Sequence, residues 1–303
     1  MDKISKVIQA VSEKLPLIDR MFNESMKNHT SFKIGGQIRA MYLPKNTEEV
    51  RLLCSILQSF GIAPLVIGNG TNLLVDDRKP LEMIAIKMTG INGARVTGEA
   101  EITAEAGLSL EKLAVFAYEH ELSGLEYAHG IPGSVGGAVT MNAGAYGSEM
   151  KDVVHSTCAY SNGKEYTVTG EEHKFSYRSS RFSDAGDVIF SSVMRLQKSD
   201  KKSIKAKMDE LKARRAESQP LELPSAGSTF KRPKDGYAAA LIQQAGLQGF
   251  FAGGAQISLK HSGFIVNNGC ATFMDVISII EHVKETVFRE FGIELEPEVK
   301  IIR

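Results

Sequence analysis

One glycine-rich stretch limits what this chain can fold into more than any other feature of its sequence. It reads GIPGSVGGAVTMNAGAYG at residues 130–147 and contains six glycines with small residues between them. Ordering so many glycines costs backbone entropy, so they are expected where the backbone must approach another group closely or adopt positive φ. Successive N–H groups in such a stretch form a nest that binds an anion. We therefore expect a ligand-binding loop here rather than a series of simple turns.

A second loop, GNGTN at residues 68–72, follows directly after the apolar run PLVIG. A pyrophosphate loop is expected at such a place, with a plain turn as the alternative for this segment taken alone. The loop is not a Rossmann fingerprint: Gly68 and Gly70 are present, but the third glycine position is Leu73, and Pro80 interrupts any following helix. The sequence also lacks the GxxxxGK[ST] phosphate loop.

Helices are predicted where apolar residues recur at helical spacing, several of them after a capping residue. They are expected at residues 4–15, 46–61, 109–117, 201–218, 237–244 and 272–291. Strand-like segments are expected at residues 28–44, 64–68, 81–88, 101–107, 153–161, 164–169, 187–196, 262–268 and 294–302. Asn162-Gly163 predicts a hairpin turn. Because helices and strands do not alternate regularly, the sequence predicts an α+β fold rather than a doubly wound sheet.

Length, charge and apolar content narrow the class of protein. A chain of 303 residues is too long for one small core, so we expect two or three subdomains, with a boundary in the polar stretch 198–201. The formal net charge is zero, which gives no general attraction to nucleic acid or to an anionic membrane. The N-terminus lacks the apolar core of a signal peptide, and no run approaches the roughly 20 apolar residues of a membrane span.

The cysteines and histidines predict no metal site. Cys54, Cys158 and Cys270 are odd in number, far apart and without a CxxC pair, so neither a zinc site nor a disulfide framework is expected. A reducing cytoplasm fits this pattern best. The histidines have no metal-ligand spacing; they are His29, His120, His129, His155, His173, His261 and His282.

Six segments together resemble those of a known enzyme family. They are TSFKIGG, IGNGTNLLV, GIPGSVGGAVTMNAGAYG, YRSSRF, AGSTFKRP and LEPEVKII. At these separations the chain resembles the UDP-N-acetylenolpyruvoylglucosamine reductases over nearly its whole length. The resemblance implies a two-subdomain FAD-binding fold of the vanillyl-alcohol oxidase (PCMH) type at 1–199, split near 80–95, and an α+β substrate-binding domain at 200–303. The C-terminal part is too short for the tyrosine loop and split βαββ insertion of the longer type, so the chain resembles the shorter second type.

The resemblance also implies the reaction. FAD is bound non-covalently, and NADPH is the co-substrate in the reduction of UDP-N-acetylglucosamine enolpyruvate to UDP-N-acetylmuramate for peptidoglycan synthesis. Hydride passes from NADPH through FAD N5 to the terminal carbon of the enolpyruvyl group. Electrons then accumulate beside the carboxylate as an enediolate-like intermediate. The protein must stabilise that charge and protonate the adjacent carbon.

The implied FAD contacts come from both glycine-rich loops. They are Ile67, Gly68, Asn69, Gly70, Asn72, Leu73, Gly133, Ser134, Gly136, Gly137, Asn142, Gly144 and Ala145.

The implied catalytic residues are Arg178, Ser228 and Glu298. Arg178, in YRSSRF, is expected to hold the carboxylate, because a guanidinium is permanently charged and forks onto two oxygens; Arg181 nearby could be confused with it. Ser228, in AGSTF, is expected to protonate carbon, since a strongly basic enediolate accepts a proton even from a hydroxyl. From the residues alone, Arg178 reads as a surface arginine and Ser228 as a turn serine.

Glu298 lies on the last predicted strand. Alternation places Leu295, Val299 and Ile301 on one face and Glu296, Glu298 and Lys300 on the other. The pattern alone indicates a solvated charged face. The resemblance instead places Glu298 in a closed site, where a carboxylic acid can donate a hydrogen bond to developing charge. Glu296 is the second candidate for this role.

Lys231 and Arg232 are candidate substrate-binding residues. Arg232 stands where longer members of the family often have an asparagine that contacts the substrate, and its charge suits the UDP diphosphate. His29 and His129 lie near the flavin segments, where some relatives in the wider fold tether FAD. Because this family binds FAD non-covalently, we expect no tether.

Two other functions remain open from the sequence. One is an oxidase of the same flavin fold, which would consume oxygen without a UDP-sugar. The other is a non-catalytic flavin- or nucleotide-binding module, which would keep a stable flavin spectrum and oxidise no NADPH.

Overall fold

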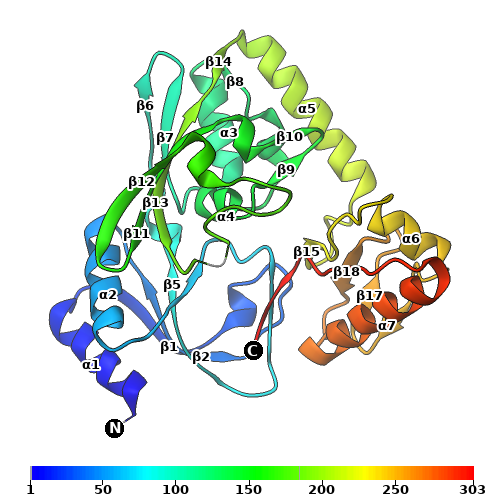
Figure 1. The fold of residues 1–303 in the computed structure, drawn as a ribbon, viewed down its shortest axis with the longest axis horizontal. Coiled ribbons are helices and arrows are strands. Elements are labelled where there is room, and N and C mark those ends of the chain that lie inside the picture. Colours follow the sequence, from blue (N-terminus) through cyan, green and yellow to red (C-terminus); the bar gives the residue numbers. More distant parts are fainter. Residues whose placement is uncertain (1, 184) are drawn as a thin grey trace. The chain divides into compact units, whose positions relative to one another are not determined.

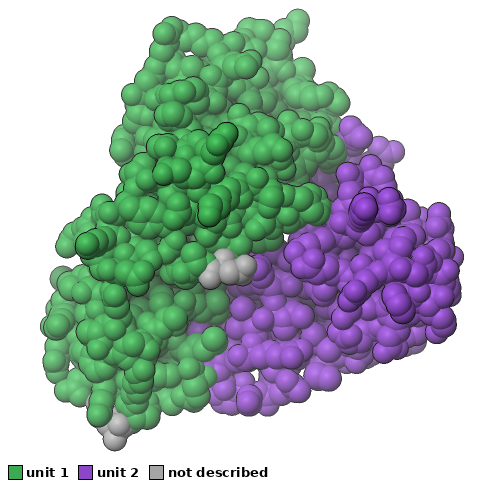
Figure 2. Space-filling model, in the orientation of Figure 1, with its two compact units in different colours: residues 1–22, 39–69, 82–213 green, residues 23–38, 70–81, 214–303 purple. Residues whose placement is uncertain are grey.

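The computed structural model describes residues 2–183 and 185–303. They form two compact units, drawn in green and purple in Figure 2. Unit 1 is built from the described parts of residues 1–22, 39–69 and 82–213, and unit 2 from residues 23–38, 70–81 and 214–303. Each unit therefore joins three separate pieces of the chain.

The first sheet of the fold has four strands in the order β1-β2-β5-β3. Strands β1, β2 and β5 are labelled in Figure 1. Their bounds are β1 (Asp19–Ser25), β2 (Gln37–Leu43), β5 (Leu81–Lys87) and β3 (Leu65–Ile67). Helices α1 (Lys3–Lys14) and α2 (Thr47–Ser59) contact one another. Their helical spacing gathers Val7, Val50 and Leu53 on faces that are fully buried in the core of unit 1. Burial of these apolar faces stabilises the helices more than their propensity does.

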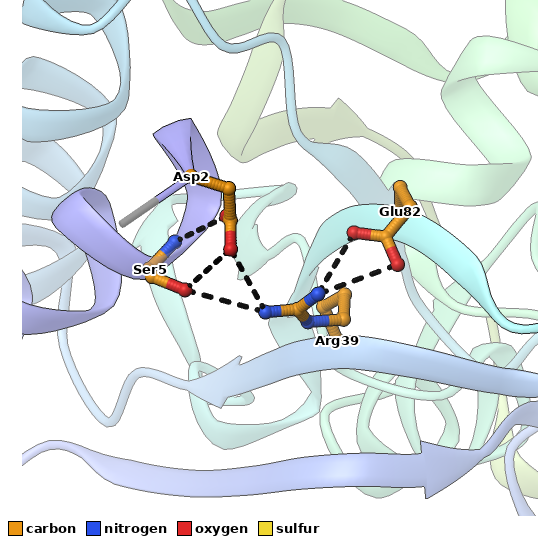
Figure 3. Close-up of polar contacts among 4 residues, drawn as sticks. All are labelled: Asp2, Ser5, Arg39 and Glu82. Atoms are coloured by element: carbon orange, nitrogen blue, oxygen red, sulfur yellow. Dashed lines mark hydrogen bonds and ion pairs between the residues drawn. The ribbon is translucent and has the colours of Figure 1, made fainter.

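A polar cluster on Arg39 of β2 connects the start of α1 to β5 (Figure 3). The Asp2 carboxylate caps α1 by accepting from the Ser5 N–H at 2.9 Å and the Ser5 hydroxyl at 2.7 Å. The Arg39 guanidinium donates to Ser5 Oγ at 3.3 Å and to Glu82 Oε2 at 3.0 Å. Because these side chains are partly exposed, the cluster orients α1 more than it stabilises the fold.

The second sheet of unit 1 has five antiparallel strands in the order β12-β11-β13-β7-β6. Their bounds are β12 (Lys164–Thr169), β11 (Val154–Ser161), β13 (Val188–Arg195), β7 (Glu101–Glu105) and β6 (Ala94–Gly98). Asn162 and Gly163 have φ values of 49° and 82°. Positive φ at both central positions is what a type I′ hairpin turn requires, and Ser161 pairs with Lys164 across it, so the predicted hairpin is confirmed.

The glycine-rich stretch folds in part into a helix on this second sheet. Helix α4 (Val135–Thr140) contacts β7 and β13, and α3 (Leu110–Glu119) contacts α4. The remaining strands of unit 1 are β8 (Leu122–Ser123), β9 (Gly144–Ala145), β10 (Ser148–Glu149) and β14 (Gln197–Lys198). Short 3₁₀ helices are η1 (Met26–Asn28), η2 (Met88–Gly90), η3 (Glu126–Gly130), η4 (Met150–Asp152) and η5 (Gly170–His173). Helix α5 (Lys201–Ser218) begins in unit 1 and ends in unit 2.

Unit 2 has its own sheet and core. The sheet order is β15-β18-β17-β16, with bounds β15 (Ser225–Ser228), β18 (Phe264–Asn267), β17 (Ala255–Ile257) and β16 (Phe251–Ala252). Helix α7 (Phe273–Phe291) contacts β16 and β17, and α6 (Ala238–Gln244) contacts α7. The buried apolar faces of these helices close one core with the sheet. A parallel pair, β4 (Leu73–Val75) with β19 (Lys300–Ile302), completes the unit.

Long-range hydrogen bonds explain why unit 2 contains two N-terminal pieces. The piece 70–81 joins through the β4–β19 pair. The piece 23–38 joins because Ser31 Oγ donates to the Ser225 carbonyl at 2.6 Å and Asn267 Nδ2 donates to the Phe32 carbonyl at 3.0 Å. The compact units therefore do not coincide with the two predicted domains, residues 1–199 and 200–303. That division stays a prediction about functional domains.

Local sequence signals located the helices well and the strands less well. Asn46 and Ser109 accept hydrogen bonds from the N–H groups of Glu49 and Lys112, so the two predicted caps are confirmed. Thr272, predicted as the start of the last helix, also caps it by accepting from the Asp275 N–H. By contrast, β1, β6 and β15 were not predicted, and the regular strand predicted over 294–302 is limited to β19. Strand pairing depends on partners far away in the chain, which a local pattern does not contain.

No helix of the described residues is both long and apolar enough to cross a bilayer.

Candidate active site

The two glycine-rich loops touch one another within unit 1. Asn69 Nδ2 donates to the Gly133 carbonyl at 3.1 Å. A Cβ at Gly68 would lie 2.0 Å from Ser134 Oγ, which is closer than real Cβ contacts. Ser134 is the N-cap of α4 and accepts from the Gly137 N–H. Gly68 is therefore required because Ser134, in the glycine-rich stretch 130–147, occupies the space of a side chain.

The backbone of the GNGTN loop, residues 68–72, offers hydrogen-bond donors. Among the described residues, none accepts a hydrogen bond from the backbone N–H groups of Asn69, Gly70 or Thr71. Gly70 has φ of 64°, and a Cβ there would lie 2.0 Å from the His29 carbonyl oxygen. Unused N–H groups in a tight loop are what a phosphate nest needs. These residues fit the pyrophosphate of FAD.

The end of the glycine-rich stretch holds the turn that carries Arg178. The fully buried Asn142 donates from Nδ2 to the Ser176 carbonyl at 3.0 Å, and its Oδ1 accepts from the Lys151 N–H at 2.9 Å. Ser180 Oγ donates to the Thr140 carbonyl at 2.8 Å. The Asn142 side chain is thus engaged within the protein. It joins the predicted flavin stretch to the YRSSRF segment.

Arg178 is half-buried and sits in a strained turn. Ser176 and Ser179 exchange backbone hydrogen bonds around it, at 3.0 and 3.2 Å. Its φ of 52° lies in the left-handed region, which is uncommon for a residue with a long side chain. Its Nη2 donates to the Gly144 carbonyl at 3.2 Å, and its guanidinium lies 5.2 Å from the centre of the Tyr177 ring.

Arg181 points to a different neighbourhood. It is exposed, its guanidinium lies 5.4 Å from the centre of the Tyr166 ring, and Nη1 donates to the Glu172 carbonyl at 3.5 Å. Arg178 contacts the glycine-rich stretch, whereas the contacts of Arg181 are with β12 and η5. Arg178 and Arg181, which lie close together in the sequence, therefore have different surroundings.

Ser228 and Glu298 belong to neighbouring segments of unit 2. The carbonyl of Thr229, the residue after Ser228, accepts from the Glu298 N–H at 2.8 Å. Phe230 and Pro297 form an antiparallel bridge next to this bond. Ser228 is exposed at the end of β15, and Glu298 is half-buried. Ser228, the predicted proton donor, therefore directly precedes Thr229, whose carbonyl is hydrogen-bonded to the Glu298 N–H.

Asn72, predicted to contact FAD, also contacts Glu298. Its Nδ2 donates to the Glu298 carbonyl at 3.1 Å, and its own carbonyl accepts from the Lys300 N–H at 2.9 Å. Leu73 follows as the first residue of β4, paired with Lys300 of β19. The sequence offered no signal for these contacts, because they join positions more than two hundred residues apart.

Glu296 and the two basic candidates have other partners. Lys231 Nζ forms an ion pair with the Glu296 carboxylate, and the Lys231 N–H donates to the Glu296 carbonyl at 2.9 Å. The exposed Arg232 guanidinium lies 4.0 Å from the centre of the Tyr237 ring. Tyr237, whose ring is also exposed, was not predicted as a site residue. The charge of Lys231 is thus compensated locally by Glu296.

The two histidines near the flavin segments differ in surroundings. His29 Nε2 lies 3.0 Å from Glu24 Oε1. His129 Nδ1 is buried without a hydrogen-bond partner in the described structure, and burial lowers the pKa of this imidazole from its usual value. His129 is therefore held mainly in its neutral form near neutral pH.

Comparison with known proteins gives the class and the family. Residues 38–169 match the FAD binding domain family, and residues 219–302 match the family described as UDP-N-acetylenolpyruvoylglucosamine reductase, C-terminal domain. The predicted fold class, an α+β FAD-binding fold followed by an α+β C-terminal domain, is confirmed. The chain is an FAD-dependent oxidoreductase.

Relatives and a solved structure agree with this assignment. The chain is 47% identical over 281 residues to a UDP-N-acetylenolpyruvoylglucosamine reductase of Caldanaerobacter subterraneus, with 92% of each sequence covered. It is 42% identical over 300 residues to the enzyme of Clostridium novyi, covering 99% of this chain and 96% of that one. The crystal structure of the reductase from Thermus caldophilus is similar with a TM-score of 0.81 and 32% identity, covering 94% of this chain and 99% of that one. The chain belongs to the UDP-N-acetylenolpyruvoylglucosamine reductase family.

Proposed function

We propose that this chain uses NADPH to reduce UDP-N-acetylglucosamine enolpyruvate to UDP-N-acetylmuramate, a step of peptidoglycan precursor synthesis. The family assignment supports the substrate and the FAD. The observation in the structure that supports it most is the assembly of Asn142, Gly144 and Arg178. It joins the predicted flavin stretch directly to the guanidinium proposed to bind the substrate carboxylate.

The FAD would be held by the two glycine-rich loops. The N–H groups of Asn69, Gly70 and Thr71 supply donors to the pyrophosphate, and the glycines allow close approach of the backbone. When bound there, FAD supplies reversible two-electron hydride transfer. Ile67, Gly133, Gly136 and Ala145 remain proposed contacts on the same loops.

Arg178 is proposed to bind the carboxylate of the enolpyruvyl group. Its positive φ and its hydrogen bond to Gly144 fix the guanidinium before substrate arrives, so little side-chain freedom is lost on binding. As hydride reaches the terminal carbon, negative charge grows on the carboxylate side. A fixed guanidinium stabilises the additional negative charge of the enediolate-like intermediate more than the single charge of the ground-state carboxylate.

Ser228 is proposed to protonate the adjacent carbon, with Glu298 hydrogen-bonded to the developing enediolate. The exposed Ser228 hydroxyl is accessible to a substrate. The Ser228 Oγ–H bond would break as the carbon–hydrogen bond forms, and Ser228 would recover a proton from solvent. Arg232 is proposed to bind the diphosphate, and Lys231 to assist it.

A cytoplasmic site of action is part of the proposal. It is supported by the cysteines, which are free thiols at Cys54, Cys158 and Cys270, as expected in a reducing compartment.

The deciding experiment measures NADPH oxidation by the FAD-loaded protein with and without the enolpyruvyl UDP-sugar. Oxidation that requires the sugar, with one NADPH consumed per product formed, supports the proposal. Oxygen consumption without the sugar would instead indicate an oxidase. A stable flavin spectrum without NADPH oxidation would indicate a binding module.

A further inference from the structure

We infer that Asn72 is a positioning residue that fixes the backbone of Glu298 for the substrate half of the reaction. This inference rests on the proposed function, because it concerns how Glu298 is placed. The family resemblance gave Asn72 only a flavin contact. The structure gives its side chain a protein partner at the other end of the chain, the Glu298 carbonyl, 3.1 Å away.

Both peptide groups that flank the Cα of Glu298 are hydrogen-bonded. On one side, the Glu298 N–H donates to the Thr229 carbonyl at 2.8 Å, next to Ser228. On the other side, the Glu298 carbonyl accepts from Asn72 Nδ2, while the Asn72 carbonyl accepts from the Lys300 N–H at 2.9 Å. With both peptide planes fixed, the direction in which the Glu298 side chain leaves the backbone is set relative to Ser228 and to Asn72.

Asn72 acts where the regular strand pairing ends. The β4–β19 ladder begins at Leu73 and Lys300, so the peptide of Glu298 lies just beyond it. The Asn72 side-chain amide therefore extends the hydrogen bonding between the two segments beyond the β4–β19 pair, to the carbonyl of Glu298. Only a donor can do this, because the group to be held is a carbonyl oxygen.

The chain contains a matched control in the same loop. Asn69 and Asn72 are the two asparagines of GNGTN, and both side chains donate to backbone carbonyls. Asn69 donates to Gly133 at 3.1 Å and to Pro132 at 3.5 Å, and Asn72 donates to Glu298 at 3.1 Å. Replacing either asparagine by alanine removes the same amide group together with its hydrogen bonds to backbone carbonyls. If the structure assigns their roles correctly, the two alanine variants should fail in different ways.

The test compares Asn69→Ala and Asn72→Ala in the full-length protein. Bound FAD per chain and the flavin dissociation constant are measured first, and then each half-reaction is followed by stopped flow. We expect Asn69→Ala to weaken FAD binding. Asn72→Ala should keep FAD and its reduction by NADPH. Its limiting rate of flavin reoxidation by the enolpyruvyl UDP-sugar should fall roughly 10- to 100-fold, with little change in substrate affinity.

A conservative variant separates positioning from general structure. Asn72→Gln keeps the amide donor but moves it by one methylene, so the reoxidation rate should lie between those of the native protein and Asn72→Ala, with FAD binding unchanged. The Gln variant also serves if the alanine variant does not fold.

Two results would overturn the inference. Loss of FAD from Asn72→Ala or Asn72→Gln to the same degree as from Asn69→Ala would make Asn72 a flavin contact alone. Native reoxidation rates in both Asn72 variants would show that the bond to Glu298 is not needed. If the native protein itself is not reoxidised by the enolpyruvyl UDP-sugar, the proposed function fails instead, and the native control shows this separately.

Discussion

The Arg178 guanidinium donates a hydrogen bond to the carbonyl oxygen of Gly144, so a side chain proposed to bind substrate is fixed on the stretch proposed to bind FAD. Asn142 strengthens this connection through the Ser176 carbonyl. A cofactor loop and a substrate-binding arginine that share backbone contacts must move together. Perturbing one is therefore expected to affect the geometry of the other.

Replacing Arg178 by lysine should lower kcat/KM for the enolpyruvyl UDP-sugar roughly 10- to 100-fold, the cost of losing a charged, forked hydrogen bond. NADPH reduction of the flavin should change little. Arg181→Lys is the control, since Arg181 contacts Tyr166 and Glu172 and not the glycine-rich stretch. Steady-state kinetics decide, and an equal loss in both variants would remove the special role of Arg178.

Ser228→Ala should separate the half-reactions. Flavin reduction by NADPH requires no proton donor to substrate carbon, so its rate should stay near that of the native protein. Reoxidation by the enolpyruvyl UDP-sugar should slow by roughly 10² to 10⁴, as for removal of a general acid. Stopped-flow absorbance of the flavin follows both steps. Equal slowing of both would assign Ser228 to folding or flavin binding.

Glu298→Gln and Glu296→Gln should differ, although both residues lie on one predicted face. Glu298 is half-buried beside Thr229, whereas Glu296 is exposed and paired with Lys231. We expect the Glu298 variant to slow the substrate half-reaction by at least tenfold, and the Glu296 variant to change it little, because an exposed ion pair contributes little. The opposite order of rates would make Glu296 the functional carboxyl.

Gly68→Ala should abolish FAD binding, because the new Cβ would lie 2.0 Å from Ser134 Oγ. Adding Ser134→Gly removes both Ser134 atoms that the Cβ would meet and costs only a few tenths of a kcal/mol at an N-cap. The double variant should therefore regain part of the flavin absorbance. Full FAD occupancy in Gly68→Ala alone would show that the two loops need not approach closely.

Asp76 should make the free energy of unfolding depend on pH in the acid range. Hydrogen bonds from Arg78 lower the pKa of this buried carboxyl from 3.8 to about 2. Since the folded pKa is the lower one, its stabilisation is complete above pH 3.8 and is lost as the pH falls through about 2. Asp76→Asn should lower the free energy of unfolding by about 1–3 kcal/mol at neutral pH. Urea unfolding at several pH values should show the difference from the native protein vanish in acid, and a constant difference would contradict the pairing.

Local chemistry makes part of this fold predictable from the amino-acid sequence. Asn46, Ser109 and Thr272 signal helix starts because a capping side chain acts on backbone groups three residues away. Asn162-Gly163 signals a hairpin because both residues tolerate positive φ. The motifs around Arg178, Ser228 and Glu298 are likewise visible, since each is a short run of adjacent residues.

The sequence by itself therefore determined the α-helices other than α4, the hairpin, the FAD-binding class and the short motifs of the candidate site. Only the tertiary structure decided that Asn72 holds Glu298, that Asn142 holds the Arg178 turn, and that residues 23–38 and 70–81 belong to unit 2. The physical reason is the range of the interactions. Caps and turns act within a few residues, whereas these hydrogen bonds form only after distant segments have been brought together by the burial of two separate cores.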